Sequence, residues 1–144
     1  MAVIMRTGKG SARPARSPHG RCRWCGALDG PAALHERTRA LEHGVLRYEY
    51  WRGATPRRYY TLLAFDDHRA FITHQTSEHH ETASPALGQV IQRLRLEWLD
   101  PIAGASPLPA TEMQPALEGA ADIVVEHTDR FAAAVAQWWL ALRP

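Results

Sequence analysis

Residues 45–65, VLRYEYWRGATPRRYYTLLAF, decide the fold. The runs 45–51 and 58–65 are rich in aromatic and aliphatic residues that favour strands. The linker between them, residues 52–56, contains Gly53 and Pro56, which favour a turn. The stretch therefore predicts two strands joined as an antiparallel hairpin.

Further elements are expected on both sides of this hairpin. Their order, strand, helix, strand, strand, helix, strand, is that of a ferredoxin-like α+β fold, in which a four-stranded antiparallel sheet carries helices on one face. The flanking elements predicted are a strand within residues 20–26, a helix from Pro31 to Gly44 capped by Asp29 or Gly30, a short helix capped by Asp66 or Asp67 that runs through His74, a helix over 86–92 opened by Ser84 and Pro85, and a strand over 93–99.

Both faces of the two central runs carry large apolar groups. Leu46, Tyr48 and Tyr50 alternate with Val45 and Trp51, and the second run is apolar on both sides as well. Two helices cover only one face of a four-stranded sheet, and an exposed apolar face is unfavourable. We therefore expect a homodimer that buries the other face.

The charge is unevenly distributed. The net charge is +2, yet residues 1–21 contain five basic residues and no acidic one, so the remainder is negative. Residues 1–18 are predicted to be a disordered basic arm that is dispensable for folding. The basic charge thus lies on a tail rich in small residues, which argues against nucleic-acid binding.

The C-terminal third is predicted to be a loop and a helix that follow the main domain. Residues 19–103 form the expected ferredoxin-like domain, and residues 104–144 form a loop and a helix that pack on the body or on the partner. Residues 102–119 are rich in Pro, Ala and Gly, residues 123–125 suggest a short strand, and residues 128–142 suggest a helix capped by Thr128.

No apolar run is long enough to span a membrane, and two cysteines are too few for a secreted disulfide scaffold. We therefore expect a cytoplasmic protein. Cys22 and Cys25 could form a zinc site with His19 and His35, or Cys22 could be a buried residue of a strand.

The candidate chemistry lies in residues 73–81, THQTSEHHE. His74 follows Phe71 on the helix side that faces the sheet, and is either a hydrogen-bonded core residue or a proton acceptor at a pocket. His79 and His80 are expected on a solvated loop. If a metal binds, its ligands would be His74, His79, His80 and Glu81. The sequence has no nucleophile elbow, phosphate loop or dinucleotide fingerprint.

The motifs resemble those of the antibiotic biosynthesis monooxygenase family, which includes quinol monooxygenases. The resemblance covers about residues 20–103 and rests on Gly44 to Trp51, on residues 60–66, and on the pattern Phe71-x-x-His74-x-x-Ser77-x-His79. It implies a dimeric α+β barrel with a cavity between sheet and helices.

The resemblance also implies an activity. Members oxidise phenols or hydroquinones with O₂ without metal or flavin, so no cofactor is expected, and the partners would be a small aromatic substrate and O₂. His74 matches the family histidine and would be the catalytic base. Without a motif match to support it, we further expect Tyr48, Phe71 and Trp98 to contact the substrate and Arg95 to pair with its anion. A non-catalytic barrel that binds a small apolar ligand, or a His-rich metal-binding variant, is the alternative.

Overall fold

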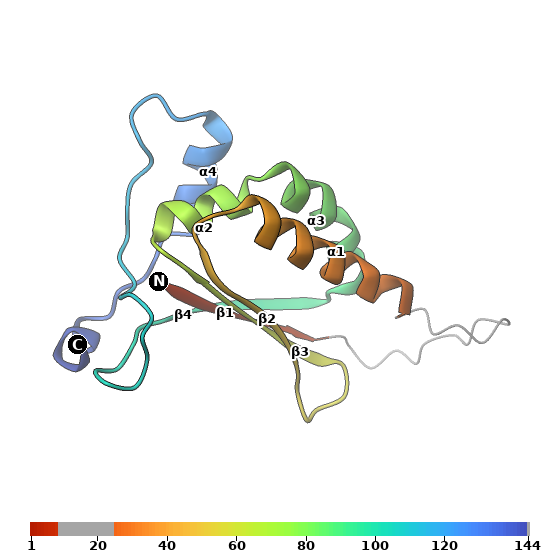
Figure 1. The fold of residues 1–144 in the computed structure, drawn as a ribbon, viewed down its shortest axis with the longest axis horizontal. Coiled ribbons are helices and arrows are strands. Elements are labelled where there is room, and N and C mark those ends of the chain that lie inside the picture. The colour runs from red at the N-terminus through yellow and green to blue at the C-terminus, as the bar shows by residue number, and fades with distance from the viewer. Residues whose placement is uncertain (9–24, 144) are drawn as a thin grey trace, which may run out of the picture.

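The computed structural model describes residues 1–8 and 25–143, and four of its strands form one antiparallel sheet in the order β2-β3-β1-β4. Helices α1 to α4 lie on one side of this sheet, so the predicted ferredoxin-like α+β fold is confirmed (Figure 1). In chain order the elements are β1 (Ala2–Gly8), α1 (Cys25–Leu41), β2 (Val45–Arg52), β3 (Arg58–Phe65), α2 (His68–Gln75), α3 (Glu78–Val90), β4 (Arg93–Leu99), α4 (Asp122–Arg130) and the 3₁₀ helix η1 (Gln137–Leu142).

The first strand is not where the sequence predicted it. Residues 2–8, assigned to a disordered arm, form the inner strand β1, which pairs with β3 on one side and β4 on the other. The short alternation of Met1, Val3 and Met5 is the apolar pattern of a half-buried strand, but the basic residues after it suggested a tail. The strand expected within residues 20–26 falls mostly outside the described residues, and Cys25 already begins α1.

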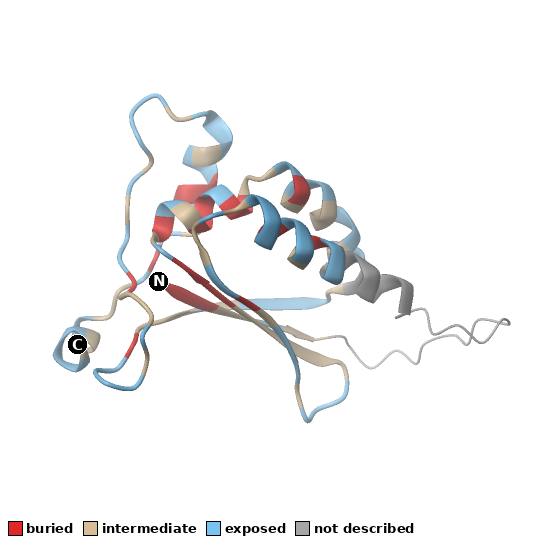
Figure 2. Ribbon diagram, viewed as in Figure 1, coloured by how far each residue is buried: buried red, intermediate tan, exposed pale blue. Residues whose placement is uncertain are grey.

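The core lies between α2 and the end of the sheet where β1 begins (Figure 2). Val3 pairs with Leu63 on β3 and with Trp98 on β4, so these three residues point to the same side. Phe65 and Phe71 complete the centre with edge-to-face rings whose centroids are 5.5 Å apart. Because β1 is paired on both edges, its backbone hydrogen bonds hold the two halves of the sheet together.

The hairpin, β4 and α2 appear as predicted, while two helices begin earlier. Asp67 caps α2 by accepting a 2.8 Å hydrogen bond from the Ala70 amide. Helix α3 is capped by Ser77 and not by Ser84, and it continues through Pro85. The missing proline amide removes one helical hydrogen bond, but the flanking Ala83 and Leu87 pack on the core and keep the helix intact.

The C-terminal third also differs from its prediction. Residues 102–119 form a loop as expected, but residues 123–125 belong to helix α4 and not to a strand. The helix expected over 128–142 is interrupted after Arg130, and only the turn η1 follows. Two contacts hold this end of the chain, a 2.9 Å hydrogen bond from the Ala103 amide to the Leu142 carbonyl and an ion pair between Arg143 and Asp100.

The sheet side opposite the helices, here called the outer face, carries apolar and charged residues side by side. Ile4 and Leu62 lie opposite each other on neighbouring strands, whereas Arg6 lies opposite Arg95. Trp51, on β2, is more than half exposed. No helix among the described residues is long and apolar enough to cross a membrane.

The inner position of β1 predicts the effect of one substitution. Val3→Asp places a charge at a fully buried position without a partner, so we expect the cooperative thermal transition to be lost. Arg37→Asp introduces the same residue at an exposed position of α1, away from the outer face, and should leave the melting temperature within a few degrees. A Val3→Asp protein that melts like the Arg37→Asp control would contradict the central place of β1.

Candidate functional site

A cavity of about 1000 Å³ lies between the inner side of the sheet and the helices. Helix α2 packs tightly on the sheet, whereas α1, α3 and α4 frame a space that is mainly apolar. The strands contribute inward-facing residues to its floor, and α4 contributes a wall. Its apolar lining includes Leu63, Leu96 and Phe131. Its polar lining includes Tyr48, Tyr50, His74, Gln75, His80, Glu81, Ser84 and His127.

His74 lies at the edge of this cavity near the end of α2. The cap at Asp67 sets the helix phase so that Phe71 enters the core and His74, one turn later, reaches the cavity. Its side chain is 1% exposed. Nδ1 lies 2.9 and 3.1 Å from the two carboxylate oxygens of Glu42, while Nε2 is buried and has no hydrogen-bond partner.

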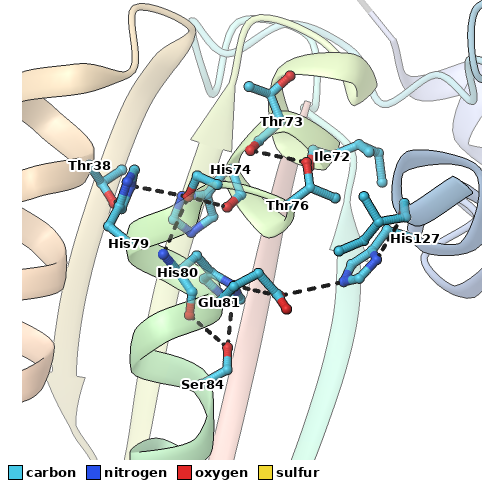
Figure 3. Close-up of polar contacts among 12 residues, drawn as sticks. Thr38, Ile72, Thr73, His74, Thr76, His79, His80, Glu81, Ser84 and His127 are labelled. Carbon is cyan, nitrogen blue, oxygen red and sulfur yellow. Dashed lines mark hydrogen bonds and ion pairs between the residues drawn. The ribbon is translucent and has the colours of Figure 1, made fainter. Parts of the chain in front are cut away.

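Glu42 is a buried carboxylate shared by two histidines. Its Oε1 also lies 2.6 Å from Nε2 of His79, on α3. The same nitrogen is 3.2 Å from Ser77 Oγ and 3.4 Å from Thr38 Oγ1, and Figure 3 shows His79 beside Thr38. Burial by itself raises the pKa of Glu42, but the hydrogen bonds and charges of His74 and His79 outweigh it and lower that pKa. Glu42 is therefore ionised at neutral pH.

Gln75, the residue after His74, also lines the cavity. Its side chain is 5% exposed, and its Nε2 is buried without a hydrogen-bond partner. Buried polar atoms are rarely left unpaired in proteins, so this nitrogen is a candidate donor to a ligand oxygen. Two neighbouring residues that line the cavity thus each carry a buried polar atom without a hydrogen-bond partner.

A second polar group joins α3 to α4. His80 Nδ1 lies 3.9 Å from Oε1 of Glu81, and His127 Nε2 lies 3.8 Å from the same oxygen (Figure 3). His127 Nδ1 donates to the Ile123 carbonyl at 2.9 Å, and Ser84 Oγ lies 3.4 Å from His80 Nδ1. Burial lowers the pKa of His80 to about 4, helped by the nearby His74, so His80 is uncharged at neutral pH.

Two tyrosines of β2 add hydroxyl groups to the cavity. The hydroxyls of Tyr48 and Tyr50 are 2.9 Å apart and hydrogen-bonded. Burial raises the pKa of both phenols, so both remain protonated at neutral pH. The Tyr48 ring meets His74 edge-on at 5.5 Å and fixes one side of the imidazole.

Of the residues predicted to form the site, the structure brings His74 and Tyr48 to the cavity. Phe71 is fully buried in the core, and Trp98 packs on it while donating a hydrogen bond to the Ala132 carbonyl. Arg95 points from the outer face of β4, where it lies 3.6 Å from Glu97. Contact of Phe71, Trp98 or Arg95 with a ligand in this cavity is therefore not supported.

The four residues considered as metal ligands, His74, His79, His80 and Glu81, do not form one cluster. His79 and His80 are on helix α3, not on a solvated loop. Among the described residues, only Glu42, His74 and His79 place potential ligand atoms within 4.8 Å of one another. Their nitrogen–oxygen separations of 2.6 to 3.1 Å are those of direct hydrogen bonds. His19 and Cys22, considered for a zinc site, lie outside the described residues.

Sequence reasoning missed Glu42, Gln75 and His127. Glu42 follows α1 and is 32 residues from His74, so no local spacing connects the two. His127 was assigned to the space between a strand and a helix, and Gln75 has no partner that would mark it in the sequence. Only the position of Glu42 just before Gly44, where the chain turns into β2, hinted that its side chain is held against the body.

Comparison with known proteins agrees with the fold. Residues 31–86 match the family model for antibiotic biosynthesis monooxygenase, and this segment contains Glu42, His74, Gln75 and His79. A structure from Caulobacter crescentus named for that family is 20% identical, covers 70% of this chain and 88% of its own, and has a TM-score of 0.58. A structure from Mycobacterium tuberculosis is 22% identical, with coverages of 73% and 97% and a TM-score of 0.55. No curated protein matches the chain.

The match over residues 31–86, together with a fold shared with structures that carry the family's name, confirms the resemblance predicted from the motifs: this chain is similar to the antibiotic biosynthesis monooxygenases.

Proposed function

We propose that this protein is a cofactor-independent monooxygenase that oxidises a small phenolic or hydroquinone substrate with O₂. The observation that carries the proposal is His74, a buried histidine with one nitrogen on a carboxylate and the other unpartnered beside a mainly apolar cavity. A base in that position removes a phenolic proton, and an apolar cavity suits a flat aromatic ring.

The reaction balances without an external reductant. Deprotonation by His74 gives an electron-rich phenolate, which transfers electrons to O₂. One oxygen atom replaces a ring hydrogen and becomes a carbonyl oxygen of the quinone. The other leaves as water with that hydrogen and the phenolic hydrogen, and the ring supplies the electrons.

Gln75 is proposed as the hydrogen-bond donor to the substrate oxygen. Its buried Nε2 lacks an acceptor, and it follows the proposed base in the same helix. A neutral amide stabilises a phenolate oxygen without holding a proton that would compete with His74. The hydroxyls of Tyr48 and Tyr50 lie on the floor of the same cavity and give it a further polar edge.

The test of the base is O₂ consumption with a panel of phenols and hydroquinones, corrected for the spontaneous oxidation of each. His74→Ala should lower turnover about 10²–10⁴-fold, the usual contribution of a positioned general base. His43→Ala, at an exposed histidine, is the matched control and should retain activity. Unchanged turnover per folded molecule in His74→Ala, with a lower melting temperature, would place His74 in the core only. Absence of uptake in the unmodified protein, with aromatic ligands still bound, would favour the binding barrel.

Replacing the proposed donor should affect the chemical step. Gln75→Leu keeps a similar volume but removes the amide, and we expect turnover to fall about 10²–10³-fold, as for the loss of an oxyanion donor. The melting temperature should not fall, because the orphan nitrogen is removed from a buried site. A normal turnover in Gln75→Leu would rule out the donor role.

We also propose a homodimer through the outer face, as the apolar character of both sheet sides predicts. On that face the apolar pair Ile4 and Leu62, which is flanked by Glu49 and Glu97, and the exposed Trp51 have no helix over them. Sedimentation at micromolar concentration should give twice the 16.1 kDa of one chain. Leu62→Glu should shift the protein to monomer, whereas Arg37→Glu on the exposed side of α1 should not. A monodisperse monomer in the unmodified protein would refute the dimer.

A further inference from the structure

We infer that Glu42 and His79 form a buried ion pair that holds His74 as the Nδ1–H tautomer and so keeps its unpartnered Nε2 available to accept a proton. Glu42 is thereby a positioning residue and His79 its counter-charge. The kinetic consequence rests on the proposed function, whereas the tautomer and the ion pair do not.

The tautomer follows from the contacts of His74. The ionised Glu42 carboxylate can only accept hydrogen bonds, and both of its oxygens lie within 3.1 Å of Nδ1. Nδ1 must therefore carry the hydrogen. In a neutral imidazole the other nitrogen then has a lone pair, and Nε2 is the atom that the structure leaves without a partner.

The charge of His79 follows from the burial of Glu42. The side chain of Glu42 is 9% exposed, and within residues 1–8 and 25–143 its two ion pairs are both with histidines. A buried carboxylate is strongly unfavourable unless it is paired. His79 has the shorter contact, 2.6 Å, which is typical of a charge-assisted hydrogen bond.

The surroundings of His79 show which of its ring nitrogens donates. Three oxygen atoms, from Glu42, Ser77 and Thr38, surround its Nε2. Ser77 donates its own hydroxyl hydrogen to the His74 carbonyl at 2.8 Å, so its oxygen is left to accept from His79. Nε2 of His79 is therefore a donor, and the carboxylate is its nearest acceptor.

Within the described part of the chain, the two other titratable side chains whose rings contact His74 carry no charge at neutral pH. His80, on α3, has its ring 4.9 Å from that of His74, and Tyr48, on β2, meets His74 edge-on. The first is neutral because burial lowers its pKa, and the second because burial raises its pKa. The charges that bear on His74 are thus the anion of Glu42 and the cation of His79, with opposite signs and opposite effects on its basicity.

The first experiment needs no substrate. Two-bond ¹H–¹⁵N spectra of the ¹⁵N-labelled full chain at pH 7 should show His74 with hydrogen on Nδ1 only and His79 with hydrogen on both ring nitrogens. An Nε2–H tautomer of His74, or a neutral His79, would overturn the inference. Addition of Zn²⁺ should leave these signals unchanged, and their loss on binding would show that the three groups serve a metal instead.

The second experiment compares pH profiles of kcat/KM for O₂ consumption in two variants. Glu42→Gln removes the anion, so the acid limb should move to lower pH by about one unit, with a lower kcat because the amide also admits the other tautomer. His79→Gln removes the cation, so the acid limb should move to higher pH by about one unit. Glu36→Gln, at an exposed acid on α1, should not move the profile.

Shifts of the acid limb in opposite directions in Glu42→Gln and His79→Gln support the ion pair. Shifts in the same direction, or no shift, overturn it. A purely structural role would lower the melting temperature without moving the acid limb. If a variant fails to fold, the spectra of the unmodified protein decide the question. If the unmodified protein consumes no O₂ but gives the expected spectra, the proposed function fails and the ion pair stands.

Discussion

The helical layer depends on the contacts that the Glu42 carboxylate makes with two histidines. Glu42 lies just after α1 and contacts His74 on α2 and His79 on α3, so one buried anion connects three elements on the same side of the sheet. A carboxylate with so little exposure to solvent is stable there only because two imidazoles donate hydrogen bonds to it. The same contacts leave the second nitrogen of His74, a residue that lines the cavity, without a hydrogen-bond partner, so the interaction that connects the helices also belongs to the candidate site.

The cavity exists because the helices cover the sheet unevenly. Helix α2 buries Phe71 and Ile72 against β1 and β3, which closes one end of the sheet. The other end is roofed by α1 and α3 at a greater distance, and α4 supplies a wall. Burial is concentrated at the closed end, as Figure 2 shows, so the rigid core fixes the base while the open end remains free to receive a ligand.

The C-terminal segment packs on the body and lines part of the cavity. Phe131 packs on Phe71, with ring centroids 5.7 Å apart, and His127 reaches the carboxylate of Glu81. These residues lie beyond the segment that matches the family model, residues 31–86. The wall formed by α4 therefore distinguishes this cavity from one built by the matched segment alone.

The sequence alone determined the hairpin, β4, α2 and the order of elements, because alternation and helix caps are local signals. It also pointed to His74, through its motif, and to Tyr48, and the structure places both residues at the cavity. It could not place β1, since three alternating apolar residues before a basic stretch do not reveal that both edges of that strand will be paired. Nor could it show that His79 is buried or that Phe71, Trp98 and Arg95 lie away from the cavity. The surroundings of each of these side chains depend on which elements pack against it. The Glu42–His74–His79 cluster was decided only by tertiary structure, since it joins residues from the ends of three elements and a hydrogen bond across 32 residues leaves no periodic trace in the sequence.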